Sequence, residues 1–132
     1  MKTITIASKH KSQIIDISDE VKEAVITSGI KEGICLVFTP HTTASVLLFE
    51  NADPKLQRDL LGALSMIAPH ENQFSHAGGN ATAHIKSSRA GASVTVPVTN
   101  GQPLLGQWQG IFFAEFDGPR EAREVIIKVI AG

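Results

Sequence analysis

Three histidines lie in polar stretches that could carry chemistry. His41 belongs to PHTTAS, and His76 and His84 stand eight positions apart in SHAGGNATAH. Histidine is the commonest transition-metal ligand, and three of them with one open coordination position can bind zinc and activate water. Their spacing matches no simple ligand signature. The residue types alone therefore leave both a metal site and a structural role open for each ring.

Two further polar stretches flank the same part of the chain. Thr42 and Ser45 follow an apolar run and offer hydroxyl groups beside His41, and ENADP supplies Asn51 and Asp53. Polar residues on loops that a rigid scaffold holds are frequent in functional sites. Asp53 also has a structural interpretation, because an aspartate before a proline is a typical start of a helix. We interpret Asp53 as a helix cap first and as a catalytic carboxylate second.

The segment GQWQGIFFAEF contains the single tryptophan and an isolated carboxylate. Trp108 and Gln109 lie between two glycines, which indicates either a core tryptophan beside a bulge or a ligand contact. Glu115 lies among aromatic residues, and if buried it needs a partner such as Arg120, Arg123 or a metal.

A helix beginning at Asn80 would place Lys86 or Arg89 where a basic side chain could meet an anionic substrate. In such a helix Asn80 and His84 would share one face, one turn apart.

The elements that must position these residues follow from hydrophobic periodicity. Alternating or continuous apolar runs predict strands, and capped runs with helical spacing predict helices. The predicted strands cover 3–6, 13–17, 34–38, 45–49, 94–98, 108–116 and 125–130, and the predicted helices cover 18–29 and 54–67. We predict a single α+β domain over residues 1–132, with a mixed, mainly antiparallel sheet or sandwich and two to three helices.

The composition limits the classes of binding partner that we expect. The net charge is −1, which gives no basic footprint for nucleic acid or an anionic membrane surface. No apolar run is long enough to span a bilayer, and the alternating N-terminus does not resemble a signal peptide. Cys35 has no second cysteine to pair with and is predicted to be a buried, unreactive thiol. These features predict a cytoplasmic protein with a small-molecule partner.

Several blocks occur in one order along the whole chain: PHTTASVLLFENADP, SHAGGNATAHIKSS, GASVTVPV and GQWQGIFFAEFDGPR. This order closely resembles the YjbQ or UPF0047 family, also called the secondary thiamine-phosphate synthase family. The resemblance implies an α+β homotrimer with sites near subunit boundaries. It also makes His41, His76, His84, Asn51, Asp53, Trp108 and Gln109 signature positions. On that basis we interpret the three histidines as site residues.

The resemblance implies a transferase of the secondary thiamine-phosphate synthase type, which joins hydroxymethylpyrimidine pyrophosphate to thiazole phosphate. In this hypothesis a small anionic or phosphorylated metabolite binds a histidine-lined site. His41, His76 and His84 would hold a divalent metal, with a zinc-like transition metal favoured over magnesium. His41, Asp53 and Glu115 are the predicted catalytic residues. The predicted substrate-binding residues are Thr42, Ser45, Asn51, Lys86, Trp108, Gln109 and Arg120.

Two alternatives use the same residues. The first is a metal-dependent hydrolase in which the histidines activate water. The second is a non-catalytic module that binds a metabolite or a metal and shows no turnover.

Overall fold

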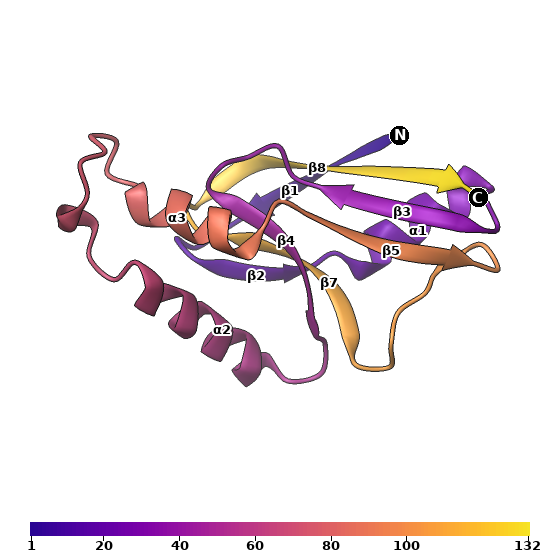
Figure 1. The fold of residues 1–132 in the computed structure, drawn as a ribbon, viewed down its shortest axis with the longest axis horizontal. Helices are drawn as coiled ribbons and strands as arrows, with labels where there is room; N and C mark the ends of the chain where they lie inside the picture. Colours follow the sequence, from indigo (N-terminus) through magenta and orange to yellow (C-terminus); the bar gives the residue numbers. More distant parts are fainter.

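Two antiparallel sheets pack face to face in the computed structural model, which describes residues 1–132 (Figure 1). The larger sheet has the order β1-β8-β3-β5-β6, and the smaller has the order β2-β7-β4. Their bounds are β1 Lys2–Ser8, β2 Gln13–Asp16, β3 Gly33–Phe38, β4 Ala44–Glu50, β5 Ser93–Thr99, β6 Gln102–Pro103, β7 Gln109–Glu115 and β8 Arg120–Ala131. The helices are α1 Ser18–Ser28, α2 Pro54–Ile67 and α3 Ala81–Ala90, with a short 3₁₀ turn at Glu71–Gln73. The predicted α+β class is confirmed.

The main core lies between the two sheets and α1. It includes Val37 of β3, Val125 of β8, Val46 of β4 and Val25 of α1, all with at most 1% of their surface exposed. A second, smaller cluster joins the outer face of the small sheet to α2 and α3. The small sheet is therefore the middle layer of the molecule, with the large sheet on one side and α2 and α3 on the other (Figure 1).

This middle position explains the long apolar run of β7. Ile111 and Phe113 belong to the main core, whereas Ala114 packs in the cluster beneath α2 and α3. Successive side chains of a strand point to opposite faces, so a strand covered on both faces is apolar throughout.

The structure corrects three local predictions. The continuous apolar run 34–38 is typical of a central strand covered on both faces, whereas β3 is central but covered on one face only, because Ile34 is exposed while Cys35 and Val37 are buried. A serine just before acidic residues is a typical N-cap, but Ser18 does not cap α1, because its hydroxyl accepts a hydrogen bond from the main-chain N–H of Ile111 at 2.9 Å instead. Trp108 precedes β7 in a turn and is 60% exposed, so it is not a core residue.

None of the helices combines the length and apolar character needed to cross a membrane. Cys35 is buried, as predicted, and burial raises the pKa of its thiol to about 11. A thiol with such a pKa is a poor nucleophile, since the thiolate is the reactive form.

Asp53 caps α2 as its sequence context predicts. Its carboxylate accepts a hydrogen bond from the main-chain N–H of Lys55 at 2.9 Å, and Pro54 is the first helical residue. We expect Asp53→Ala to lower the free energy of unfolding by about 1 kcal/mol, because one N–H at the helix start loses its acceptor. Urea denaturation measures this, with Asp59→Ala in the same helix as the control. Equal stability of the two variants would contradict the cap.

Candidate functional site around His84

His84 is at the centre of the polar region on α3. It lines three hollows: one of about 360 Å³ with His76 and Phe74, one of about 440 Å³ with Arg89, and one of about 290 Å³ with His41. The rings of His76 and His84 meet edge to face, with centroids 5.3 Å apart. The fold thus places the three predicted histidines along α3, with His76 beside its N-terminal part, His41 beside its C-terminal part and His84 between them.

His41 closes the end of a strand ladder. The pairing of β3 with β8 stops at Phe38 and Ile126, and Glu124 lies just beyond on β8. The main-chain N–H of Glu124 donates to Nε2 of His41 at 2.9 Å, and the main-chain carbonyl of Glu124 accepts from the Thr39 hydroxyl at 3.0 Å. Two side chains that follow β3 therefore replace the next backbone partners in the ladder.

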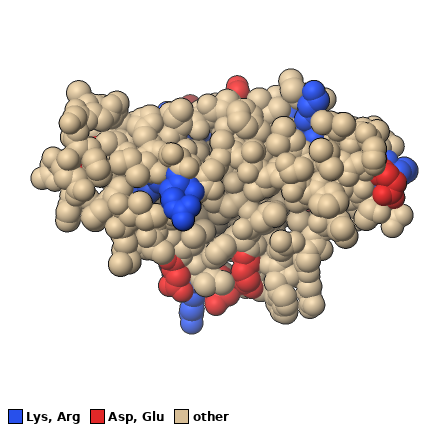
Figure 2. Space-filling view, in the orientation of Figure 1, with Lys and Arg blue, Asp and Glu red and all other residues tan.

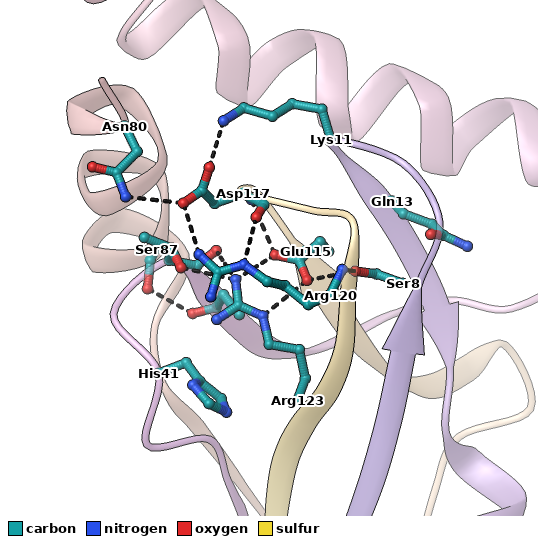
Figure 3. A network of polar contacts seen from close by, with 12 residues as sticks. Ser8, Lys11, Gln13, His41, Asn80, Ser87, Glu115, Asp117, Arg120 and Arg123 are labelled. Carbon is teal, nitrogen blue, oxygen red and sulfur yellow. Dashed lines mark hydrogen bonds and ion pairs between the residues drawn. The ribbon is translucent and has the colours of Figure 1, made fainter. Parts of the chain in front are cut away.

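The region beside His41 rests on a buried ion pair between Glu115 of β7 and Arg123 of β8 (Figure 3). Both guanidinium Nε and Nη2 donate to the carboxylate, and Nη2 also donates to the hydroxyl of Thr43 at 2.8 Å. Ser8 and the main-chain N–H of Asp117 complete the carboxylate's set of donors. Burial alone would raise the pKa of Glu115, but the hydrogen bonds from Arg123 and Ser8 hold it below its usual range.

Both carboxylate oxygens of Glu115 therefore already accept hydrogen bonds from groups of the protein itself. Of the partners the sequence suggested, Arg123 is the one that contacts it, and the structure gives the pair a role in holding β7, β8 and the β3–β4 connection together. The catalytic role predicted for Glu115 finds no support in this geometry, because none of the three hollows around His84 is lined by it.

A second hydrogen-bonded chain leads from Asp117 to His76. Asp117 accepts from the Asn80 amide at 2.9 Å, from Arg120 at 3.0 Å and from Lys11 (Figure 3). The Asn80 carbonyl oxygen in turn lies 3.0 Å from Nε2 of His76. Burial would raise the pKa of Asp117, and the hydrogen bonds from Lys11 and Asn80 outweigh it and lower that pKa.

The N-terminus of α3 is occupied by a carboxylate of the same chain. Glu71 accepts from the main-chain N–H of Ala81 at 2.7 Å and of Thr82 at 3.1 Å, while Asn80 makes no cap bond. These hydrogen bonds, led by the one from Thr82, lower the pKa of Glu71. The helix exists where the sequence suggested, but its cap comes from a residue ten positions earlier.

A second group of predicted residues lies at the opposite end of β4. Asn51 donates to the main-chain carbonyl of Gln109 at 3.2 Å, and Trp108 lies in the adjoining turn. The seven residues of β4 separate this group from His41, which is about 20 Å at roughly 3.3 Å per residue. One chain therefore does not bring the tryptophan and the histidines together.

The remaining predicted residues lie near α3 or Asp117, and their contacts differ. Thr42 lines the hollow of His41 and His84. Ser45 is fully buried and donates to the carbonyl of Ser87, so it ties β4 to α3. Lys86 points toward α2, where Ser65 is its hydrogen-bond partner at 3.4 Å, and Arg120 is held by Asp117. The sequence analysis did not select Ser88 or Asp117. A serine on a helix and an aspartate in a turn are both common, so neither residue type is a signal for a site.

The charges differ between the two ends of β4. Basic side chains lie over α3, whereas acidic ones gather where β4 turns into α2 (Figure 2). Lys86 and Arg89 make no ion pair. Burial, and then the charge of Lys11, lowers the pKa of Lys86. An anion at α3 would find cations without carboxylate partners.

A metal ion fits this donor set in part. The rings of His76 and His84 are neighbours, but no group of three or more His, Cys, Asp or Glu side chains in the chain is arranged to hold a metal ion. Nε2 of His41 already accepts a hydrogen bond from the main chain. The three-histidine metal site stays a prediction.

Comparison with known proteins agrees with this architecture. The UPF0047 protein MJ1081 of Methanocaldococcus jannaschii is 46% identical over 95% of this chain and 90% of its own length. The UPF0047 protein YugU of Bacillus subtilis is 44% identical over 98% of each chain. A crystal structure of an uncharacterized YjbQ/UPF0047 protein from Clostridium acetobutylicum superposes with a TM-score of 0.95 at 44% identity, covering 98% of this chain and 100% of that one.

A YbjQ-like protein of unknown function from Sulfolobus solfataricus is more distant in sequence, at 32% identity, yet superposes with a TM-score of 0.92 over 99% of this chain and 96% of that one. The family model described as UPF0047 protein YjbQ-like matches residues 2–132. The chain therefore belongs to the YjbQ/UPF0047 family.

Proposed function

We propose that the protein is an enzyme that binds a small anionic or phosphorylated metabolite around His84. The observation that supports this most is that His84 lines adjoining hollows with His41, His76 and Arg89. Imidazole and guanidinium groups donate charge-assisted hydrogen bonds to phosphate and carboxylate oxygens. Arg89 has no carboxylate partner in the chain, which leaves its charge free for such a ligand.

The reaction we propose is a group transfer of the thiamine-phosphate synthase type. In that reaction a carbon–oxygen bond to pyrophosphate breaks as a carbon–nitrogen bond to the thiazole forms, so negative charge develops on the leaving group. Donors placed where that charge develops lower the barrier. Arg89, His84 and the hydroxyl of Ser88 line one hollow and are the groups that we assign to the leaving pyrophosphate.

We further propose that the complete site forms between copies of the chain in a homotrimer. Trp108 is 60% exposed and Leu104 is 54% exposed on the segment between β6 and β7, on the far side of β4 from the histidines. In a closed ring each copy presents one face to one neighbour and a different face to the other. Asn51, Gln109 and Trp108 of one copy would then face the histidines of the next.

A divalent metal is a second element of the proposal, favoured by the approach of the His76 and His84 rings to 5.3 Å. These two residues would hold it, and when bound it would neutralise charge on a phosphate oxygen.

The test is calorimetric titration with inorganic pyrophosphate. We expect His84→Ala to weaken binding by about ten- to hundredfold, because a hydrogen bond to a charged group contributes roughly 1.5–3 kcal/mol. His10→Ala, an exposed histidine outside all three hollows, is the matched control and should bind like the wild type.

Repeating the titration after a chelator, together with elemental analysis, separates direct binding from metal-assisted binding. Unchanged affinity in His84→Ala would contradict the site. Binding without turnover of the two thiamine precursors would favour the non-catalytic module.

A further inference from the structure

His41 has a main-chain partner that determines which of its ring nitrogens carries the proton. The N–H of Glu124 donates to Nε2 at 2.9 Å. A main-chain N–H can only donate, so Nε2 must be an acceptor and carries no hydrogen. A neutral imidazole has one N–H and one acceptor nitrogen, and the proton must therefore be on Nδ1.

The surrounding elements make this contact difficult to exchange. Glu124 follows Arg123, whose guanidinium is locked to Glu115 and Thr43 in the buried network. The carbonyl of Glu124 is bound by Thr39, so this residue is held on both its main-chain groups. The strand thus presents its N–H to His41 from a fixed position.

Nδ1 of His41 is open to a ligand. Nδ1 has no hydrogen-bond partner in the chain. Every buried side-chain nitrogen or oxygen in the protein does have a partner, so an unpaired Nδ1 must be accessible to solvent. The ring lines the hollow that also contains His84, Ser87 and Ser88. A second proton on Nε2 would face the Glu124 N–H, so the same contact favours the neutral ring.

We propose that the fold holds His41 as the Nδ1–H tautomer, so that it serves as a neutral hydrogen-bond donor to an oxygen of the bound anion. The tautomer follows from the contacts of His41 alone, whereas its role toward the anion rests on the proposed function. In this form His41 offers no lone pair to a metal or to a proton, since a metal at Nδ1 would displace the proton and set two N–H donors against each other at Nε2.

His76 provides the opposite case in the same molecule. The carboxylate of Asp117 can only accept, so the Asn80 amide must turn its NH₂ toward Asp117 and its oxygen toward His76. Nε2 of His76 is then the donor, and Nδ1 holds the lone pair. This ring serves as the internal comparison for the experiment.

The tautomers are read from long-range ¹H–¹⁵N correlation spectra of histidine-labelled protein at roughly pH 8.5, where an ordinary imidazole is neutral. Single His→Gln variants assign each ring. We expect His41 to show a protonated Nδ1 and an unprotonated Nε2, and His76 to show the reverse. An Nε2–H form of His41, or averaging of its two nitrogens, would overturn the proposal whether or not the protein binds any anion.

The donor role is tested with two substitutions at one position. Glutamine can accept from Glu124 through its oxygen and still offer an N–H₂ donor, whereas alanine can do neither. We expect His41→Gln to bind inorganic pyrophosphate within about threefold of the wild type and His41→Ala to bind at least about tenfold more weakly. Urea denaturation verifies that both variants fold.

Equal losses in the two variants would overturn the donor role and favour a lone-pair or metal role. If the wild type does not bind pyrophosphate, the proposed function fails, while the spectra still decide the tautomer.

Discussion

Replacing Glu115 with glutamine is expected to lower the free energy of unfolding by about 3–5 kcal/mol. The carboxylate is fully buried and receives hydrogen bonds from Arg123, Ser8 and the N–H of Asp117. Glutamine has nearly the same shape but no charge, so the buried guanidinium of Arg123 loses its counter-ion. Equilibrium denaturation in urea measures the change.

The control removes both charges. A Glu115→Leu/Arg123→Met double variant leaves no unpaired buried ion, and such replacements are often neutral or stabilising. We therefore expect the double variant to be more stable than Glu115→Gln. A single variant as stable as the wild type would mean that the pair contributes little to the fold around His41.

The carboxylates of Glu115 and Asp117 make the stability of the fold depend on pH. The pKa of Glu115 and that of Asp117 are lowered in the folded protein from ordinary values of 4.5 and 3.8. A carboxylate with a lowered pKa stabilises the fold above its ordinary pKa, and that stability is lost as the pH falls through the folded value. Glu115→Gln should therefore lose less stability than the wild type between about pH 5 and pH 2.

Local signals in the sequence predicted most of the elements. Asp53 and Pro54 define the start of α2 because the cap and the first helical residue are adjacent in the chain. The strand content of IFFAE follows from its apolar run, although the run alone does not say that β7 is the middle layer. The predicted strand 108–116 wrongly included Trp108, because the apolar run that defines the strand begins only at Ile111 and the tryptophan lies in the preceding turn.

Long-range partners account for what the sequence did not predict. α3 begins at Ala81 as the Asn80 cap suggested, yet Glu71 supplies the hydrogen bonds from ten residues away. Glu115 was expected to need a cation, but the choice between Arg120 and Arg123 depends on which side chain of β8 points inward. The convergence of His41, His76 and His84 likewise depends on how α3 packs on β4, which no local spacing records.

The division of the predicted site between the two ends of β4 leads to the second large effect. In the proposed ring, His84 of one copy works with Asn51 and Trp108 of its neighbour. His84→Ala and Asn51→Ala/Trp108→Ala should therefore each weaken pyrophosphate binding at least about tenfold when pure. In an evenly mixed assembly, each boundary has a one-in-four chance of pairing an intact histidine face with an intact tryptophan face. About a quarter of the sites in the mixed assembly should therefore bind pyrophosphate with wild-type affinity.

Coexpression of the two variants, followed by purification of the mixed assembly and calorimetric titration, measures this recovery. The matched control mixes His84→Ala with His41→Ala, which damage the same hollow and so leave no intact histidine face at any boundary. Recovery in the first mixture alone requires a site that two copies share, because neither pure variant retains one within a single chain. Wild-type binding by pure Asn51→Ala/Trp108→Ala would contradict the shared site, because that variant keeps the hollows around His84 intact. It would show that the tryptophan turn and the histidines act separately and that the hollows hold the anion within one copy.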